Sequence, residues 1–219
     1  MMESVLIAAV SAVQAYLLGS IDTGILVSKF LYHDDVRKYG SGAAGMTNML
    51  RTFGKKAAAL TAFGDVLKGV LAVCIGRWLF TQMPESTTLS PYLAVYLAAI
   101  FAIIGHLKPL YFGFKGGKGI LCSGTLLLLL DWRIALVGWG AFVVLWLTTR
   151  YVSLGSVAAA VSQPFTTYFV FHNTACTVLG TCISLLVLWA HRSNIKRLLS
   201  GTESKFHFHV NAPKPGEDE

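Results

Sequence analysis

Charged side chains are scarce in this sequence of 219 residues, where they make up only 13%. That share is about half of what soluble domains carry, whereas 54% of the residues are hydrophobic and the mean hydropathy is +0.60. So little charge cannot cover a water-facing surface, which excludes an ordinary soluble domain. The net charge of +7 therefore does not indicate nucleic-acid binding, because membrane proteins concentrate lysine and arginine in cytoplasmic loops. The composition predicts an all-α integral membrane protein.

Recognisable metal-binding patterns are also missing. The four cysteines of the chain lie in apolar stretches without C-x-x-C spacing, as small packing residues do. They are Cys74, Cys122, Cys176 and Cys182. The polar end of the chain, 200–219, has the composition of a disordered tail, and we interpret its His207 and His209 as an incidental pair. We expect no metal and no cofactor.

Apolar runs long enough to cross a bilayer, about 20 residues, recur along the chain. The clear runs are 4–28, 57–80, 90–105, 133–149, 153–171 and 174–191. The first run follows Glu3 and no basic residue, unlike a secretory signal, so we expect it to be a span. A shorter run, 119–130, completes a predicted domain of seven transmembrane helices over residues 1–199.

Basic residues alternate between the connections. Of the 18 lysines and arginines, 15 lie in 29–56, in 106–118, at Arg150 or after residue 191. Seven helices place all of these segments on one side of the membrane, and the positive-inside rule makes that side cytoplasmic. We therefore expect the N-terminus outside and the C-terminus in the cytoplasm.

Glycine, serine, threonine and asparagine gather on the same basic side. They occur in GSGAAGMTNMLR (40–51), GHLKPLYFGFKGGKG (105–119) and TRYVSLGSV (149–157). The first segment offers backbone N–H groups, hydroxyls and an amide, and it ends at Arg51, a composition typical of an anion site. Segments that only connect helices do not need so many hydrogen-bonding groups.

The second segment places three glycines around Lys118, immediately before the 119–130 helix. Glycines let the backbone approach an anion closely, and a helix N-terminus adds unpaired N–H groups and a favourable dipole. A Walker A loop is excluded because glycine, not serine or threonine, follows Lys118. The alternative interpretation is a flexible basic turn at headgroup level.

Ionisable residues also lie within or at the ends of spans. Asp65 and Lys68 share one helical face, as either a structural ion pair or a substrate contact. His191 ends the last span, where a cap matched to the helix dipole is the simpler interpretation.

The chain resembles the bacterial PlsY family of acyl-phosphate:glycerol-3-phosphate acyltransferases. The matching motifs are LLGSI (17–21), SG-x-x-G-x-TN-x-x-R (41–51), D-x-x-KG (65–69), GH-x-x-P with FKGGKG (105–119), RYVSLGS (150–156) and HR-x-NI-x-RLL (191–199). They appear in family order over residues 15–200, although Ala43 and Met46 replace the usual Asn and Ala. The resemblance implies a multi-pass enzyme of the bacterial inner membrane with a cytoplasmic active site.

The resemblance further implies transfer of a fatty acyl group from acyl phosphate to the sn-1 hydroxyl of glycerol 3-phosphate, which gives lysophosphatidic acid. The expected catalytic residues are Lys118, Ser156, His191 and Asn194. The expected substrate-binding residues are Ser41, Gly42, Thr47, Asn48, Arg51, His106, Lys115, Gly116, Gly117, Gly119 and Ser153. The partners are these two substrates and membrane lipid, without nucleic acid, and we expect a monomer.

The chemistry needs no covalent acyl-enzyme, because the phosphate of an acyl phosphate is already a good leaving group. Positioning and charge stabilisation are sufficient. We expect the 115–119 loop to hold the acyl phosphate, Ser41 and Arg51 to hold glycerol 3-phosphate, and His191 with Asn194 to orient its hydroxyl. The proton acceptor is either His191 or the substrate's own phosphate. No G-x-S-x-G motif supports a serine nucleophile.

Two other functions use similar basic pockets. A transporter of an anionic metabolite is disfavoured, because the sequence shows no internal repeat and its polar motifs lie towards one face. Acyl transfer from acyl-CoA or acyl carrier protein is disfavoured by the absence of an H-x-x-x-x-D box, since Tyr111 stands five positions after His106.

Overall fold

The structure, a computed structural model, describes residues 2–83 and 91–206. Every regular element in these residues is helical, which confirms the all-α prediction. The α-helices are α1 (Met2–Gly19), α2 (Thr23–Tyr32), α3 (Met46–Thr81), α4 (Pro91–Leu107), α5 (Ile120–Leu130), α6 (Trp132–Thr149), α7 (Val152–Phe171), α8 (Thr174–Ala190) and α9 (Arg192–Leu199). Short 3₁₀ turns η1 (Val36–Lys38) and η2 (Leu110–Phe112) lie in the connections.

Several of these helices have the length and composition of membrane spans. Within the described residues, 4 helical stretches qualify on their own: Met2–Tyr32, Met46–Thr81, Tyr92–Phe112 and Trp132–Thr149. The bent pair α8–α9 raises the number to 5, and α5 is a shorter apolar helix. The described residues thus form an all-α structure with four to five candidate spans.

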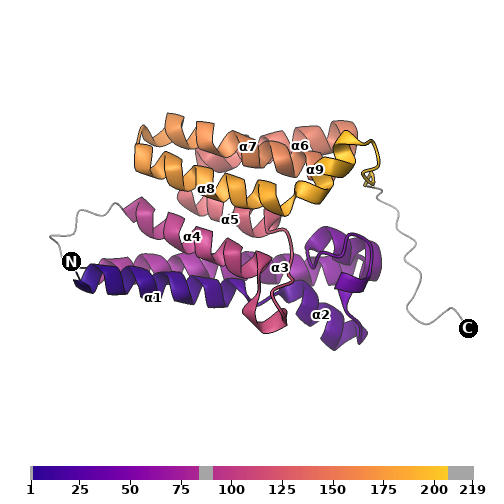
Figure 1. Ribbon diagram of the computed structural model, residues 1–219, viewed down its shortest axis with the longest axis horizontal. Coiled ribbons are helices and arrows are strands. Elements are labelled where there is room, and N and C mark those ends of the chain that lie inside the picture. Colours follow the sequence, from indigo (N-terminus) through magenta and orange to yellow (C-terminus); the bar gives the residue numbers. More distant parts are fainter. Residues whose placement is uncertain (1, 84–90, 207–219) are drawn as a thin grey trace, which may run out of the picture.

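The helices form two groups that pack along their lengths (Figure 1). Helices α6, α7 and α8 lie together, α1 and α4 lie together with α3, and α5 lies between the groups. The interface is apolar and includes the fully buried Tyr96, Ile103, Leu126 and Ile183. Because lipid is as apolar as these side chains, close packing rather than hydrophobic burial holds such helices together.

The first expected span, 4–28, differs from the prediction because it breaks into α1 and α2. Asp22 lies at the break and is buried, and its Oδ1 accepts a hydrogen bond from the backbone N–H of Ile25 at 3.2 Å. The carboxylate therefore caps α2, satisfying one of the unpaired donors of a helix start.

The second expected span, 57–80, begins earlier than predicted. Helix α3 starts at Met46 and bends at Gly54, where φ is 84° and ψ is −172°. Only glycine adopts this conformation readily. The residues from Met46 to Phe53 are thereby a separate helical piece that carries the end of the first polar segment towards the site.

The C-terminal segment also differs from the prediction of a disordered tail from residue 200. The backbone N–H of Phe206 donates to the carbonyl of Arg150 at 2.8 Å, and the Phe206 ring packs edge-on against Trp146 with centroids 5.6 Å apart. Residues 200–206 thus form a strap from α9 to the turn between α6 and α7. His207 and His209 lie outside the described residues.

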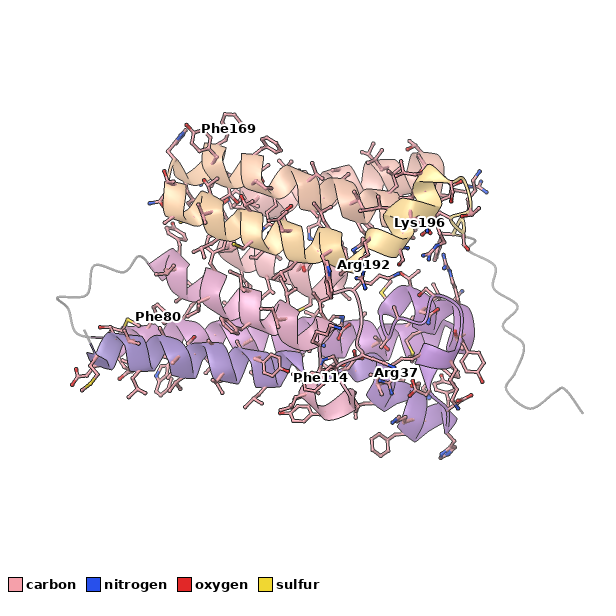
Figure 2. The ribbon with its side chains drawn as sticks, viewed as in Figure 1. Arg37, Phe80, Phe114, Phe169, Arg192 and Lys196 are labelled. Atoms are coloured by element: carbon pink, nitrogen blue, oxygen red, sulfur yellow. The ribbon has the colours of Figure 1, made fainter. Side chains whose placement is uncertain are left out.

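The two ends of the bundle differ in the labelled side chains that they carry. Figure 2 shows Arg37, Arg192 and Lys196 towards one end and the aromatic side chains of Phe80 and Phe169 towards the other. The connections that carry the polar motifs lie at the basic end, as the alternation of charge along the sequence predicts.

Candidate active site

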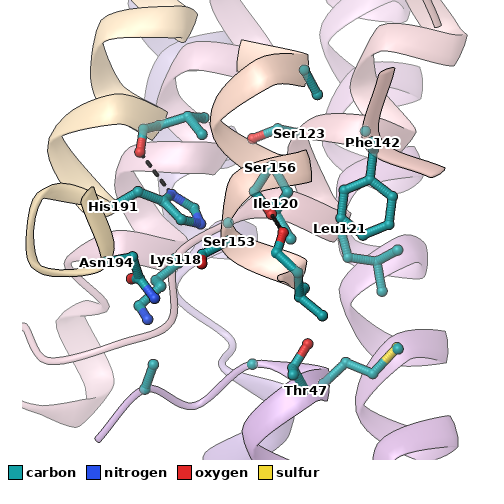
Figure 3. A pocket seen from close by; sticks show the side chains of 18 of the residues that line it. Thr47, Lys118, Ile120, Leu121, Ser123, Phe142, Ser153, Ser156, His191 and Asn194 are labelled. Carbon is teal, nitrogen blue, oxygen red and sulfur yellow. Dashed lines mark hydrogen bonds between the residues drawn. The ribbon is translucent and has the colours of Figure 1, made fainter. Parts of the chain in front are cut away.

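A cavity of about 570 Å³ opens at the basic end, between α3, the loop before α5, α6, α7 and the bend from α8 to α9. Figure 3 shows Lys118, His191 and Asn194 on one side of it and Leu121 and Phe142 on the other. The cavity therefore joins a polar, cationic region to an apolar one. That combination suits a ligand with a charged head and a hydrocarbon chain.

The three polar segments meet in this cavity, as the sequence predicts. Eleven of the expected site residues line it: Ser41, Thr47, Asn48, Arg51, His106, Lys118, Gly119, Ser153, Ser156, His191 and Asn194. The structure does not place Gly42, Lys115, Gly116 or Gly117 in the lining.

Asn48 lines the cavity, and its side chain also has a structural role. Its Nδ2 donates to the carbonyls of Val36, Tyr39 and Ala43, and its Oδ1 accepts from the backbone N–H of Ser41. The amide is therefore bound to backbone groups of residues 36–43, and it holds the loop that presents Ser41 to the cavity.

Gly116 and Gly117 also differ from our expectation of direct anion contacts. A Cβ on Gly116 would lie 2.1 Å from the His106 carbonyl oxygen, and one on Gly117 would lie 2.2 Å from His106 Nε2. The backbone N–H of Gly117 donates to the same carbonyl at 3.2 Å. These glycines let the loop pack directly on His106. This packing places Lys118, the next residue of the loop, at the cavity.

His106 is in turn held by the buried ion pair that the sequence left open. Lys68 Nζ lies 2.8 Å from Asp65 Oδ1 and donates to His106 Nδ1 at 2.7 Å and to the carbonyl of Ile21 at 3.0 Å. Both Asp65 and Lys68 are buried. The geometry thus supports a structural ion pair. Asp65 and Lys68 hold His106, and through it the loop, rather than a ligand.

Lys118 and Arg51 supply positive charge to the cavity. Lys118 lies in the loop outside the helices, and burial together with Arg197 and Arg51 lowers its pKa to about 8, against the opposing charge of Glu203. Arg51 makes no salt bridge within the part of the chain that the structure describes, whereas Arg197 pairs with Glu203. Lys118 and Arg51 are therefore available to an anionic ligand.

His191 is the C-cap residue of α8, as the simpler interpretation predicted, and it lies at the bend between α8 and α9. It is buried, and its Nδ1 lies 2.9 Å from the carbonyl of Val187, the contact dashed in Figure 3. Since a carbonyl only accepts, Nδ1 carries the proton and Nε2 of the neutral ring is an acceptor. The ring lines the cavity and can accept a proton from a bound hydroxyl.

The two serines of the third segment are not arranged as nucleophiles. Ser156 Oγ donates to the carbonyl of Val152 at 2.9 Å, and Ser153 Oγ donates to Glu203 Oε1 at 2.6 Å. No hydrogen bond joins either hydroxyl to a histidine among the described residues. A covalent acyl-serine therefore has no support in the geometry.

Arg197 and Glu203 line the cavity but were not predicted as site residues. The polar residues around Glu203 predict a disordered tail instead. Glu203 is nevertheless the only acidic residue between 192 and 205, in a strongly basic stretch. This single acidic residue among basic ones was the sequence feature that could have indicated an ordered, functional position for Glu203.

The loop has no room for a side chain at Gly117, where the His106 ring lies against the backbone. In Gly117→Ala the new methyl group meets a ring that Lys68 holds in place, so the loop must shift and displace Lys118. We expect kcat/KM to fall by about tenfold or more, with a loss of stability of about 1–3 kcal/mol. Steady-state kinetics and thermal unfolding in detergent measure the two effects.

Gly140→Ala is the matched control. A Cβ at Gly140 meets nothing within 4 Å, and the residue lies in α6 outside the cavity lining. Alanine is a better helix former than glycine by about 1 kcal/mol, so activity should be unchanged and stability equal or higher. Full activity in Gly117→Ala would contradict the role given to the loop.

Comparison with known proteins agrees with this geometry. The family model described as glycerol-3-phosphate acyltransferase matches residues 9–201. A glycerol-3-phosphate acyltransferase of Clostridioides difficile is 43% identical over 194 residues, covering 89% of this chain and 93% of the relative. One from Thermosynechococcus vestitus is 38% identical over 205 residues, covering 93% and 97%.

A solved structure is also similar. The crystal structure of PlsY (YgiH), an integral membrane glycerol 3-phosphate acyltransferase, in its glycerol 3-phosphate form has a TM-score of 0.80, with 32% identity over 91% of this chain and 96% of that one. Its lysophosphatidic acid form has a TM-score of 0.77 at 31% identity, covering 91% and 95%. The chain belongs to the glycerol-3-phosphate acyltransferase family, as its motifs indicated.

Proposed function

We propose that this membrane acyltransferase moves a fatty acyl group from an acyl phosphate to the sn-1 hydroxyl of glycerol 3-phosphate. The products are lysophosphatidic acid and inorganic phosphate. The observation that carries the proposal is the cavity itself, in which Arg51 and Lys118 adjoin both His191 and an apolar region. Solved relatives in glycerol 3-phosphate and lysophosphatidic acid forms support the acceptor and the product.

The residues divide between the two substrates. Ser41 and Arg51 hold the phosphate of glycerol 3-phosphate, and Lys118 with the start of α5 holds the phosphate of the donor, whose chain lies against Leu121 and Phe142. A helix start and fixed cations stabilise phosphate charge without reorganisation. Both substrates are then held within reach of one another.

The reaction is a single displacement. The sn-1 oxygen attacks the acyl carbonyl carbon, the bond from that carbon to the phosphate oxygen breaks, and phosphate leaves. His191 Nε2 takes the hydroxyl proton, an assignment supported by the donation of Nδ1 to Val187. No acyl-enzyme forms, and the chemistry needs no cofactor.

The same proposal includes a membrane arrangement. Seven spans, namely α1 and α3 to α8, place the N-terminus outside and the cavity at the cytoplasmic face of the bacterial inner membrane, with the protein acting as a monomer. The proposal is supported by the basic residues around the cavity and by the integral membrane structure that the chain resembles.

The donor is tested with purified protein in detergent. Palmitoyl phosphate and glycerol 3-phosphate should give equal amounts of released phosphate and lysophosphatidic acid, whereas palmitoyl-CoA should give none. Turnover with palmitoyl-CoA but not with palmitoyl phosphate would refute the donor assignment and leave acyl transfer itself intact.

A further inference from the structure

The strap of residues 200–206 brings a carboxylate into the cationic region of the cavity. Glu203 accepts hydrogen bonds from Ser153 Oγ at 2.6 Å and from Asn194 Nδ2 at 2.8 Å, both at Oε1, and from Arg197 Nε at 2.7 Å at Oε2. Its side chain is only 8% exposed. Three donors from α7 and α9 thus converge on one carboxylate, a strong and geometrically specific arrangement.

These hydrogen bonds determine how Asn194 faces the cavity. A carboxylate accepts only, so the amide nitrogen of Asn194 must face Glu203 and the amide oxygen must face away from it. Asn194 is buried, it lines the cavity, and its Oδ1 has no hydrogen-bond partner among the described residues. A buried acceptor without a partner is costly, which points to a donor supplied by a ligand.

We propose that Glu203 is a positioning residue, which fixes the Asn194 amide so that Oδ1 accepts a hydroxyl of the bound polyol phosphate. It also holds Ser153 and Arg197 at the rim of the cavity. The proposal rests on the proposed function and deepens it, because it names the group that orients the acceptor alcohol. A carboxylate fully occupied by protein donors does not compete for phosphate; it organises the groups around it.

Glu203 also balances the charge around Lys118. The charged or titratable side chains that line the same cavity are Arg51, Asp65, His106, His191, Arg197 and Glu203. Burial, Arg197 and Arg51 lower the pKa of Lys118, and Glu203 opposes them. Burial raises the pKa of Glu203 itself, but the hydrogen bonds from Ser153, Asn194 and Arg197 outweigh this and keep it below its usual value. Glu203 is therefore ionised, and its charge favours the protonated form of Lys118.

Glu203→Gln removes the charge and keeps the shape. The glutamine amide can also turn its NH₂ group towards Asn194, which frees that residue to rotate. We expect kcat/KM for glycerol 3-phosphate to fall about 10- to 100-fold, with Glu203→Asp in between. The alkaline limb of kcat/KM should move to lower pH, because Lys118 loses its proton more easily without the neighbouring carboxylate.

A double-mutant cycle separates positioning from a merely structural contribution. The cycle is measured well below the alkaline limb, where Lys118 stays charged in every variant. If Glu203 then acts through Asn194, Glu203→Gln should cost little once Asn194→Ala is present, whereas independent effects would multiply. Lys205→Gln, an exposed neighbour on the same strap, is the control and should keep wild-type kinetics. Multiplying effects, wild-type values in Glu203→Gln, or a lower KM with unchanged kcat would each overturn the proposal.

Two arms distinguish this inference from the proposed function. If wild-type protein turns over palmitoyl phosphate while Glu203→Gln equals it, only the inference fails. Titration calorimetry with glycerol 3-phosphate needs no donor. It should show weaker binding in Glu203→Gln and, to the same extent, in Asn194→Ala. Equal binding by wild-type and Glu203→Gln protein would overturn the inference even if the donor were a different acyl compound.

Discussion

Lys118→Met should reduce kcat/KM by about 10²–10³-fold while leaving the fold intact. The methionine keeps the length and the apolar stem of the lysine but removes the cation that faces the cavity beside Arg51 and Arg197. Charge that develops on the carbonyl and phosphate oxygens then loses one fixed stabilising group, and losses of this size follow the removal of a single such group. Phosphate release from palmitoyl phosphate measures the effect, and thermal unfolding checks the fold.

Lys115→Met is the matched comparison, because it removes the same charge three residues earlier in the loop. Lys115 is exposed and does not line the cavity. Its carbonyl, not its ammonium, is the group the structure uses, as an acceptor from Arg37 Nη1 at 3.0 Å. The variant should change kcat/KM by less than about threefold. Equal losses in the two variants would contradict the placement of the loop.

The pH dependence of wild-type kcat/KM should carry the signature of Lys118. Its pKa of about 8 means that the side chain is charged below that value and neutral above it. Activity that needs the cation is therefore present at neutral pH and lost as the pH rises through about 8. Lys118→Arg keeps the charge at all accessible pH values, so whatever activity it retains should lack this alkaline decline.

Much of the fold could be predicted from the sequence, because a bilayer imposes simple requirements. Long apolar runs must be helices, and the ranges expected for 133–149, 153–171 and 174–191 agree closely with α6, α7 and α8. The first run did not reveal its break, because most of the residues that flank Asp22 in GSIDTG (19–24) are small or hydroxyl-bearing, and such residues also occur within membrane spans. Its role as a cap depends on the turn that precedes it.

The location of the candidate site could be predicted from the sequence, but the roles of its individual residues could not. Polar residues on the same side of the membrane had to meet or be solvated, and their composition indicated an anion site. Whether a glycine faces an anion or a neighbouring ring depends on packing between α4 and the loop, as Gly117 and His106 show. Asn48 likewise has the composition of a binding residue and the hydrogen bonds of a structural one.

The role of the 200–206 strap was not predictable from local composition. Its residues are polar, and nothing in their order favours a helix or strand. What orders them includes long-range contacts: the carbonyl of Arg150, the ring of Trp146 and the hydroxyl of Ser153 come from parts of the chain about 50–60 residues away. Contacts of that kind appear only when α7 and α9 are in place.

His191→Gln should have the second large effect, a loss of about 10²–10⁴-fold in kcat with little change in KM for glycerol 3-phosphate. Glutamine can still donate to the Val187 carbonyl and can still hydrogen-bond a hydroxyl, but it cannot accept a proton at neutral pH. The variant therefore removes proton transfer and keeps positioning. Single-turnover measurements with palmitoyl phosphate follow the chemical step directly.

His172→Asn is the control for this change. His172 ends α7 in a left-handed conformation, with φ of 46°, which asparagine tolerates, and it does not line the cavity. It should retain wild-type kcat. If His191→Gln lost less than about tenfold, the proton would go instead to a phosphate oxygen of the bound substrates, and His191 would act by orienting the hydroxyl. The two roles predict losses that differ by an order of magnitude or more, so one rate constant decides between them.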